Sequence, residues 1–171
     1  MVRDAGCTPA ENTCPVRVDD PGKAVAGWNP YRAVFDVVWT GRRHVLFGAS
    51  QLDKWGNQNF AFIGSHDAPR TQLLGMRGAP GNTINDTTSY WVPNHSPQVV
   101  CAAVDTVCGI GYDRAALLPG DAARVHEIRR VVTNLRVLDF ETPDHRMRLR
   151  AVDPGGTVEE VQAAAGCETV G

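Results

Sequence analysis

The sequence lacks a dominant charge of either sign, and this absence excludes one class of partner. Its 171 residues include 17 Lys and Arg against 19 Asp and Glu, which gives a net charge of -2 at pH 7. Proteins that bind nucleic acid gather basic residues on one face. The basic pairs here, Arg42-Arg43 and Arg129-Arg130, are isolated and have no interleaved aromatic residues. We therefore expect no nucleic-acid partner.

The sequence also lacks a long apolar run. None approaches the roughly 20 residues that a membrane-spanning helix needs, and the opening Met-Val-Arg-Asp-Ala-Gly has no apolar leader core. The five cysteines are odd in number and include no C-x-x-C pair: Cys7, Cys14, Cys101, Cys108 and Cys167. These absences predict a reduced, cytoplasmic protein with no membrane partner.

The sequence predicts no metal site either. No two histidines have the H-x-x-x-H spacing, and Cys101 and Cys108 have no neighbouring histidine. A nucleophilic cysteine needs a cationic or helix N-terminal setting, which the sequence does not offer. We interpret both cysteines as small apolar residues in and after a buried strand.

Apolar residues make up 43% of the chain, enough for the core of one domain, which we assign to residues 1–171 with an irregular segment at 1–27. Asn29-Pro30 predicts the start of a helix, and Gly41 predicts its end. Apolar runs at 45–47 and 99–104 predict strands buried on both faces. That pattern is typical of a parallel sheet covered by helices, so the fold class is α/β.

The C-terminal part has a different pattern. Val131–Thr133 predicts a short strand, and apolar residues then alternate with polar ones on both sides of Thr142-Pro143-Asp144. This alternation predicts an antiparallel ribbon with one face in water. A capping box at 157–160 predicts a short helix that ends at Gly166.

Three loops are candidates for a ligand site. The glycine loop from Arg77 to Asn82 either forms an ordinary turn or lets a ligand approach exposed backbone N–H groups. The turn at 53–57 either only reverses the chain, with Gly56 supplying a positive φ, or lies beside a ligand. Asp105 follows a predicted strand, and ligands of open α/β sheets bind beyond such strand ends.

Four blocks, in order, carry a resemblance to a known family. They are Gly48–Asn59, Gly78–Asn82, Val131–Phe140 and Asp153–Gly166. These blocks resemble the β chains of class I coenzyme A transferases. Segments at 27–28, 41–45, 81–85, 88–91 and 109–113 most closely resemble the branch of that family that opens the last steroid ring in bacterial cholesterol catabolism.

The resemblance implies a Rossmann-like, mostly parallel sheet flanked by helices, with an antiparallel C-terminal ribbon. It implies an α subunit as partner in a heterodimer or heterotetramer, an acyl-CoA thioester as substrate, and no bound cofactor. Gly78, Ala79, Gly81 and Asn82 are the implied contacts to the thioester. The implied reaction is hydrolytic ring opening of a steroid-derived CoA thioester. Transfer of CoA between short-chain 3-oxo or dicarboxylic acids is the alternative.

Glu11 is the candidate catalytic residue. Ordinary members of the family use the glutamate of a Ser-Glu-Asn-Gly motif to attack the thioester, and here Ala10 and Thr13 replace the Ser and Gly. In the steroid branch the main glutamate comes from the α subunit, which makes Glu11 a bystander. The segment before Glu11 is shorter than in the family, so we expect a truncated start and an incomplete sheet with an exposed apolar edge. A non-catalytic partner or remnant is therefore a further alternative.

Overall fold

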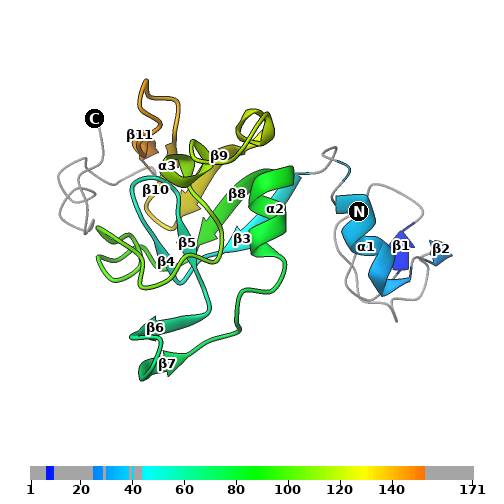
Figure 1. Ribbon diagram of the computed structural model, residues 1–171, viewed down its shortest axis with the longest axis horizontal. Helices are drawn as coiled ribbons and strands as arrows, with labels where there is room; N and C mark the ends of the chain where they lie inside the picture. The colour runs from blue at the N-terminus through cyan, green and yellow to red at the C-terminus, as the bar shows by residue number, and fades with distance from the viewer. Residues whose placement is uncertain (1–6, 10–24, 29, 39, 41–43, 153–171) are drawn as a thin grey trace.

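The computed structural model describes residues 7–9, 25–28, 30–38, 40 and 44–152. Its main feature is a five-stranded sheet with the order β11-β10-β9-β8-β3 (Figure 1). The strands are β3 (His44–Gly48), β8 (Thr87–Val92), β9 (Glu127–Thr133), β10 (Arg136–Asp139) and β11 (Arg148–Val152). Strands β3, β8 and β9 are parallel, β10 is antiparallel to β9, and β11 is antiparallel to β10.

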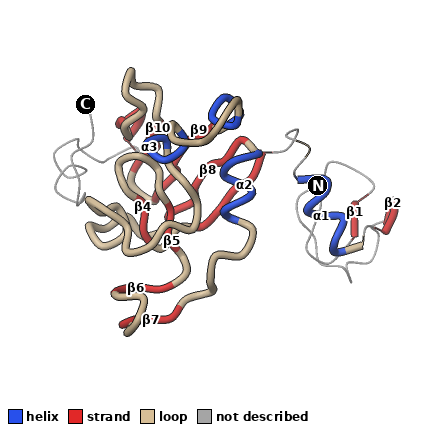
Figure 2. The backbone as a smooth tube through the Cα atoms, in the orientation of Figure 1, coloured by secondary structure: helices blue, strands red, loops and turns tan. Residues whose placement is uncertain are grey.

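The other elements are short. The helices are α1 (Tyr31–Val38), α2 (Ala79–Asn85), α3 (Tyr112–Ala115) and the 3-10 helix η1 (Ala122–Val125). The small strands pair antiparallel as β1 (Cys7–Pro9) with β2 (Val25–Trp28), β4 (Gln51–Leu52) with β5 (Gln58–Asn59), and β6 (Phe62–Gly64) with β7 (Pro69–Gln72). Figure 2 shows that the connection from β8 to β9 is mostly loop.

Several predictions of local structure are confirmed. The helix expected after Asn29-Pro30 is α1, the strand expected at 45–47 is β3, and the expected ribbon is the β10–β11 hairpin. The α/β class with a C-terminal antiparallel ribbon is therefore confirmed. The predicted helix at 157–166 lies outside the described residues. In the segment predicted to be irregular, Cys7–Pro9 and Val25–Trp28 form an antiparallel strand pair. The sequence there has no alternation of apolar and polar residues that would predict it.

The prediction of a strand at 99–104 is wrong. This segment makes a single bridge, at Val100, where the Leu52 N–H donates to Val99 O (2.7 Å) and the Cys101 N–H donates to Leu52 O (3.0 Å). Ala102 and Ala103 are exposed, because the chain leaves β4 after this bridge. The strand between β3 and β9 is instead β8, which begins with Thr87, Thr88 and Ser89 and was not expected.

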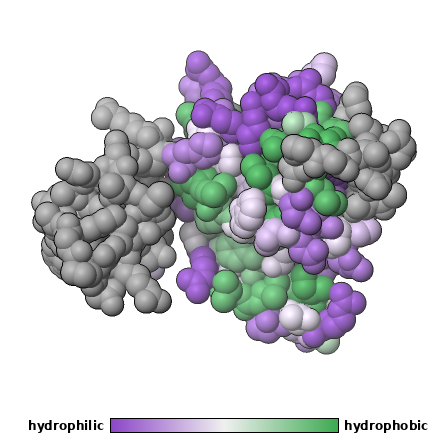
Figure 3. All heavy atoms as spheres, turned by 180° about the vertical axis from the view of Figure 1, so that it is seen from behind, coloured by the Kyte–Doolittle hydropathy of each residue, from purple (hydrophilic) through white to green (hydrophobic). Residues whose placement is uncertain are grey.

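The expectation that β3 is covered on both faces is also wrong among the described residues. Strand β3 pairs only with β8 and forms the edge of the sheet, and Leu46 is 66% exposed. Large apolar side chains are exposed elsewhere too, and Figure 3 shows apolar surface over the lower half of the view from behind. The exposed apolar edge that the sequence predicts is thus present in β3.

The hydrophobic core lies between the sheet and the loops that cover it. It consists of nine buried side chains: Leu52, Tyr90, Val92, Val100, Ile128, Val131, Leu138, Phe140 and Met147. Burial of apolar side chains of this size contributes about 1.5 to 3 kcal/mol each, so this cluster is the main source of stability for the sheet. It fixes the positions of β8 and β9 and so supports the site described next.

Candidate functional site

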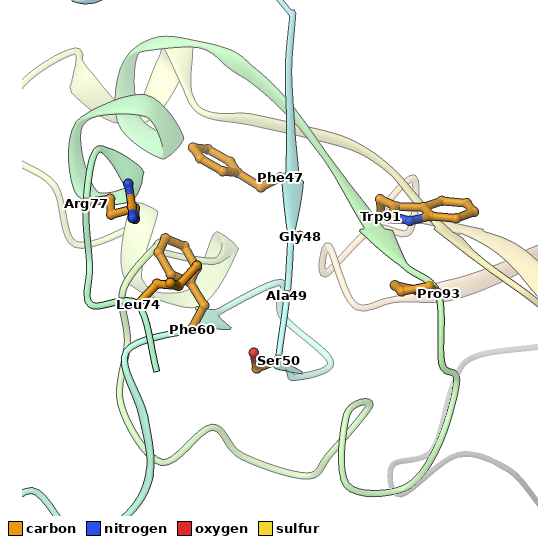
Figure 4. Close-up of a pocket in the computed structure, with 9 residues that line it drawn as sticks. All are labelled: Phe47, Gly48, Ala49, Ser50, Phe60, Leu74, Arg77, Trp91 and Pro93. Atoms are coloured by element: carbon orange, nitrogen blue, oxygen red, sulfur yellow. The ribbon is translucent and has the colours of Figure 1, made fainter. Parts of the chain in front are cut away.

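A groove of about 440 Å³ lies at the carboxyl ends of the parallel strands β3 and β8. Ligands of open α/β sheets bind at such ends, and this volume is in the range of small-molecule pockets. The described lining residues are Phe47, Gly48, Ala49, Ser50, Phe60, Leu74, Arg77, Trp91 and Pro93. Figure 4 shows small residues of β3 and its extension between two walls, with Phe60, Leu74 and Arg77 on one side and Trp91 and Pro93 on the other.

Hydrogen bonds between β5 and the segment at the end of β3 hold the small lining residues of this groove in place. The Gln58 side-chain amide donates to Gly48 O (2.8 Å), and the Ser50 N–H donates to Asn59 O (2.9 Å). The rings of Phe47 and Phe60 stack with their centroids 6.3 Å apart. These contacts tie the end of β3 to the β4–β5 hairpin, so the groove is formed by fixed elements.

The turn at Asp53–Asn57 is a structural corner. The Asp53 carboxylate accepts hydrogen bonds from the N–H groups of Trp55 (2.9 Å) and Asn57 (3.0 Å), and Gly56 has the predicted positive φ of 85°. The Asn57 side chain joins this turn to α3, because its amide oxygen accepts from the Gly111 N–H (2.8 Å). Burial raises the pKa of Asp53, and the hydrogen bonds from Asn57 and Trp55 oppose that shift.

The glycine loop predicted at 77–82 is in fact the start of a helix. Gly78 is the N-cap of α2, and Pro80 lies in its first turn, where the fixed φ of proline favours a helix. Ala79 is fully buried and Asn82 is 8% exposed. None of the predicted thioester contacts, Gly78, Ala79, Gly81 and Asn82, is among the described lining residues, although the adjacent Arg77 is. Their role stays a prediction.

Asp105 braces the loops beside the groove. Its carboxylate accepts from the Gln51 side-chain amide (3.0 Å) and the Gly64 N–H (2.8 Å), and its own N–H donates to Gln51 Oε1 (3.0 Å). Asp105 does not follow a strand, so the reason for proposing it as a ligand contact is gone. Glu11 lies outside the described residues.

Cys101 and Cys108 do not lie in a nucleophile's setting. The Cys108 thiol is buried, 2% exposed, beside Ala61 and Ala79, and the Cys101 Sγ lies 3.8 Å from Leu52 O. Within the part of the chain that the structure describes, no three His, Cys, Asp or Glu side chains are grouped as metal ligands. The same part contains no helix that is long and apolar enough to cross a membrane.

A buried histidine, His95, lies just after β8, two residues beyond Pro93 of the groove. Its imidazole Nε2 accepts a hydrogen bond from the Arg136 guanidinium, and its backbone N–H donates to Asn134 Oδ1 (2.8 Å). Burial, with a smaller effect of the Arg136 charge, lowers the pKa of His95 to about 4. His95 is therefore neutral near pH 7 and ties the end of β8 to the β9–β10 turn.

The sequence did not reveal the groove's aromatic and cationic walls. Trp91 belongs to a strand that was not expected, and Phe60 and Leu74 lie in short connecting segments. Arg77 has a positive φ of 48°, a conformation that an arginine in the sequence does not predict. For Trp91, the available signal was the Thr-Ser-Tyr-Trp run at 88–91, whose aromatic residues are typical of a strand.

No family model matches the chain, but known relatives do. The cholesterol ring-cleaving hydrolase IpdB subunit of Rhodococcus jostii (strain RHA1) is 49% identical over 148 residues, which is 86% of this chain and 58% of that relative. The B subunit of the glutaconate CoA-transferase of Acidaminococcus fermentans is 30% identical over 122 residues, covering 68% and 44% of the two chains. The chain therefore resembles both the IpdB subunits and the B subunits of coenzyme A transferases.

The fold supports the same assignment. The crystal structure of Rhodococcus jostii RHA1 IpdAB superimposes with a TM-score of 0.80, covering 85% of this chain and 58% of that one. The present chain also spans less than two thirds of the length of the IpdB and glutaconate CoA-transferase B subunits compared above. Its fold is that of a coenzyme A transferase, as the resemblance implied.

Proposed function

We propose that this chain is the B-type subunit of a heteromeric enzyme that opens a ring of a steroid-derived coenzyme A thioester by hydrolysis. The observation that carries the proposal is the 49% identity, over 148 residues, to the IpdB subunit of a cholesterol ring-cleaving hydrolase. A groove at the carboxyl ends of β3 and β8 supports it, because it offers a site of suitable size in the position typical of the fold.

The proposed partner is an A-type subunit, in a heterodimer or heterotetramer. The related crystal structure is of IpdAB, and the more distant relative is also a B subunit. The proposed substrate is an acyl-CoA thioester, with no bound cofactor. The cytoplasm is the proposed location, since the cysteine pattern predicts reduced thiols and acyl-CoA thioesters are intracellular metabolites.

The first turn of α2 is the proposed thioester contact. The first N–H groups of a helix have no partner inside it, so they are suited to polarise a carbonyl or hold a developing oxyanion. The Ala79 N–H already donates to Met76 O (3.2 Å), which leaves the N–H groups of Gly78 and Gly81 as the proposed donors. The side chains of Ala79 and Asn82 are buried. These two residues of the predicted set therefore support the first turn of α2 beside the proposed donors.

The catalytic carboxylate is proposed to come mainly from the partner. Glu11 is the candidate carboxylate in this chain, and its neighbours Ala10 and Thr13 depart from the Ser-Glu-Asn-Gly motif of the family. The proposal therefore assigns the main catalytic glutamate to the A-type subunit, while this chain supplies walls and backbone donors.

Transfer of CoA between short-chain 3-oxo or dicarboxylic acids is the second candidate reaction. The specific observation in its favour is the 30% identity to the B subunit of a glutaconate CoA-transferase. A non-catalytic role is the third candidate, because Ala10 and Thr13 depart from the catalytic motif of the family. The two reactions differ in one respect that an assay detects: transfer needs an acceptor acid, and hydrolysis does not.

The test is to co-express the chain with an A-type subunit from the same genome and to supply cyclic and short-chain acyl-CoA thioesters. Loss of thioester absorbance and release of free thiol are followed with and without an acceptor acid. We expect consumption of the cyclic substrate without an acceptor. Turnover only with an acceptor acid favours transfer, and no turnover by a folded complex rejects both reactions. An unchanged rate in Glu11→Gln places the catalytic carboxylate outside this chain.

A further inference from the structure

Two buried polar side chains lie at the amino ends of the parallel strands, whereas the groove lies at the carboxyl ends. Asp86 directly precedes β8 and is 1% exposed, and His126 directly precedes β9 and is 7% exposed. Within the described part of the chain, the carboxyl oxygens of Asp86 and the Nε2 atom of His126 have no hydrogen-bond partner. Buried polar atoms are nearly always paired, so both groups require an explanation.

The strand register places these two side chains on one face of the sheet. Thr87 is the register partner of Glu127, and its hydroxyl donates to Glu127 Oε2 (2.6 Å), so these two side chains share a face. Asp86 and His126 are the residues just before this pair, and both have extended backbones. Because successive side chains of an extended chain alternate, Asp86 and His126 both point to the opposite face. On that face α2 packs against β8 and β9.

The imidazole of His126 has the orientation that is typical of a metal ligand. Its Nδ1 atom lies 2.6 Å from Thr83 O, and because a carbonyl oxygen only accepts, Nδ1 is the donor. Burial lowers the pKa of His126, so the ring is neutral near pH 7 and Nε2 has a free lone pair. Histidines that bind metal ions commonly donate their other ring N–H to a backbone carbonyl, which fixes the tautomer.

We propose that Asp86 and His126 together bind one divalent transition-metal ion of the Zn²⁺ type, with water completing its coordination. An ionised carboxyl group and an imidazole lone pair both accept, so one cation satisfies both groups. Imidazole nitrogen suits Zn²⁺, Ni²⁺ and Cu²⁺, whereas Mg²⁺ and Ca²⁺ prefer oxygen ligands. Among the described residues no third His, Cys, Asp or Glu joins this pair, so water fills the remaining positions.

The ion would join three elements at this end of the sheet. Asp86 is the C-cap of α2 and leads into β8, while His126 holds Thr83 O of α2 and leads into β9. The proposed thioester contact is at the other end of α2, and the groove is at the other end of β8. The ion is therefore a structural ligand, and its binding does not depend on the proposed function.

Calorimetric titration tests this proposal on the full chain, which is first stripped of metal with a chelator. Zn²⁺, Co²⁺ and Mg²⁺ are the probes, each added near neutral pH. We expect one site for Zn²⁺ and Co²⁺ that depends on Asp86 and His126, and no binding of Mg²⁺ at the same concentrations. The absorption spectrum of bound Co²⁺ shows whether nitrogen and oxygen or thiolate sulfur ligates the ion.

Two variants remove one ligand each. Asp86→Asn and His126→Gln should both weaken Zn²⁺ binding by about tenfold or more, since even the loss of an outer-shell partner costs about that much. His66→Gln and Asp67→Asn are the matched controls, because these residues form an exposed His–Asp pair between β6 and β7 with Nδ1 3.4 Å from Oδ1. Neither control should change the affinity.

Unchanged Zn²⁺ affinity in both Asp86→Asn and His126→Gln overturns the proposal. A loss of affinity in His66→Gln or Asp67→Asn, with none in the other two variants, also overturns it and indicates an adventitious ion only. So does a thiolate charge-transfer band in wild type that persists in Asp86→Asn with undiminished binding, because it assigns the ion to cysteine.

Hydrogen exchange of the wild-type chain provides a test that requires no variant to fold. Zn²⁺ should slow exchange about tenfold at residues 83–88 and 126–128, because a ligand that binds only the closed state suppresses local opening. Exchange at residues 62–72, on the β6–β7 hairpin, should not change. Equal slowing in both regions, or none in either, contradicts a site at Asp86 and His126.

Discussion

Asp86, between α2 and β8, has a buried carboxyl group that no neighbour compensates. It is 1% exposed, and within the described part of the chain neither carboxyl oxygen has a hydrogen-bond partner. Burial raises its pKa from 3.8 to about 6. The ionised form is therefore disfavoured in the folded protein, so folding keeps a proton on this group to a higher pH than the unfolded chain does.

The sign of this effect predicts how Asp86→Asn responds to pH. Well below pH 3.8 the carboxyl is protonated in both states and adds no pH-dependent cost, whereas above about pH 6 its ionised form destabilises the native state. From pH 4 to pH 7 the free energy of unfolding of Asp86→Asn should therefore rise relative to wild type by on the order of 2 kcal/mol.

Urea unfolding at several pH values measures this difference. Asp67→Asn, at a side chain that is 97% exposed, is the control and should keep a nearly constant difference from wild type. A pH-independent difference for Asp86→Asn would mean that the carboxyl finds a partner or solvent in solution.

At the scale of single elements, the turn at 53–57 depends on a glycine for two separate reasons. Gly56 has a φ of 85°, and a Cβ there lies 2.5 Å from Ile128 Cδ1 and 3.1 Å from Phe140 Cζ. Gly75 has the same φ but has nothing within 4 Å of its Cβ position. The two glycines therefore share the conformational requirement and differ in packing.

This pair predicts a difference between two alanine variants. Gly75→Ala should lose about 1 to 2 kcal/mol of unfolding free energy, the cost of a positive φ for a residue with a Cβ. Gly56→Ala should lose about 1 to 3 kcal/mol more, because its methyl group overpacks the core. Chemical denaturation of both variants checks this, and equal losses would show that Ile128 and Phe140 move aside at little cost.

The elements that could be predicted from sequence are those with local signals. The β10–β11 ribbon has alternating residues and a nearby turn, and α1 has an Asn-Pro start, so each is encoded within its own segment. Strand β8 begins with three polar residues and owes its position to pairing with β3 and β9, which are distant in sequence. The run at 99–104 is apolar enough for a strand but finds only Leu52 as a bridge partner.

The candidate site could be predicted only in part for the same reason. The block that begins at Gly48 and the loop that begins at Arg77 are visible in the sequence, but the groove between them requires Trp91 on β8 and the left-handed conformation of Arg77. Neither follows from local sequence. The glycines at 78 and 81 predicted a loop, whereas Pro80 and the Thr83 hydroxyl, which donates to Ala79 O (2.8 Å), support a helix.

At the scale of the whole molecule, β3 pairs with β8 alone among the described strands and presents an apolar side chain at this edge of the sheet. Leu46 is 66% exposed on this edge, and exposed edges are sites of unwanted strand pairing. Leu46→Lys should therefore reduce self-association at high protein concentration, while the free energy of unfolding changes by less than about 0.5 kcal/mol.

Sedimentation velocity over a range of concentrations measures this effect. Leu117→Lys, at a position that is 82% exposed just after α3 and away from the sheet edge, is the matched control. Equal self-association of the two variants and wild type would show that β3 does not mediate contacts between copies.

The sheet changes from parallel to antiparallel pairing at β9, and the two parts should form at different rates during folding. Arg136 pairs with Val152 across one hairpin, whereas His44 pairs with Thr87 and Thr87 with Glu127 only after long intervening segments have closed. Closing a longer loop loses more chain entropy before any contact compensates for it. The C-terminal ribbon should therefore acquire hydrogen-exchange protection early in refolding, and the strands that form the groove should acquire it last.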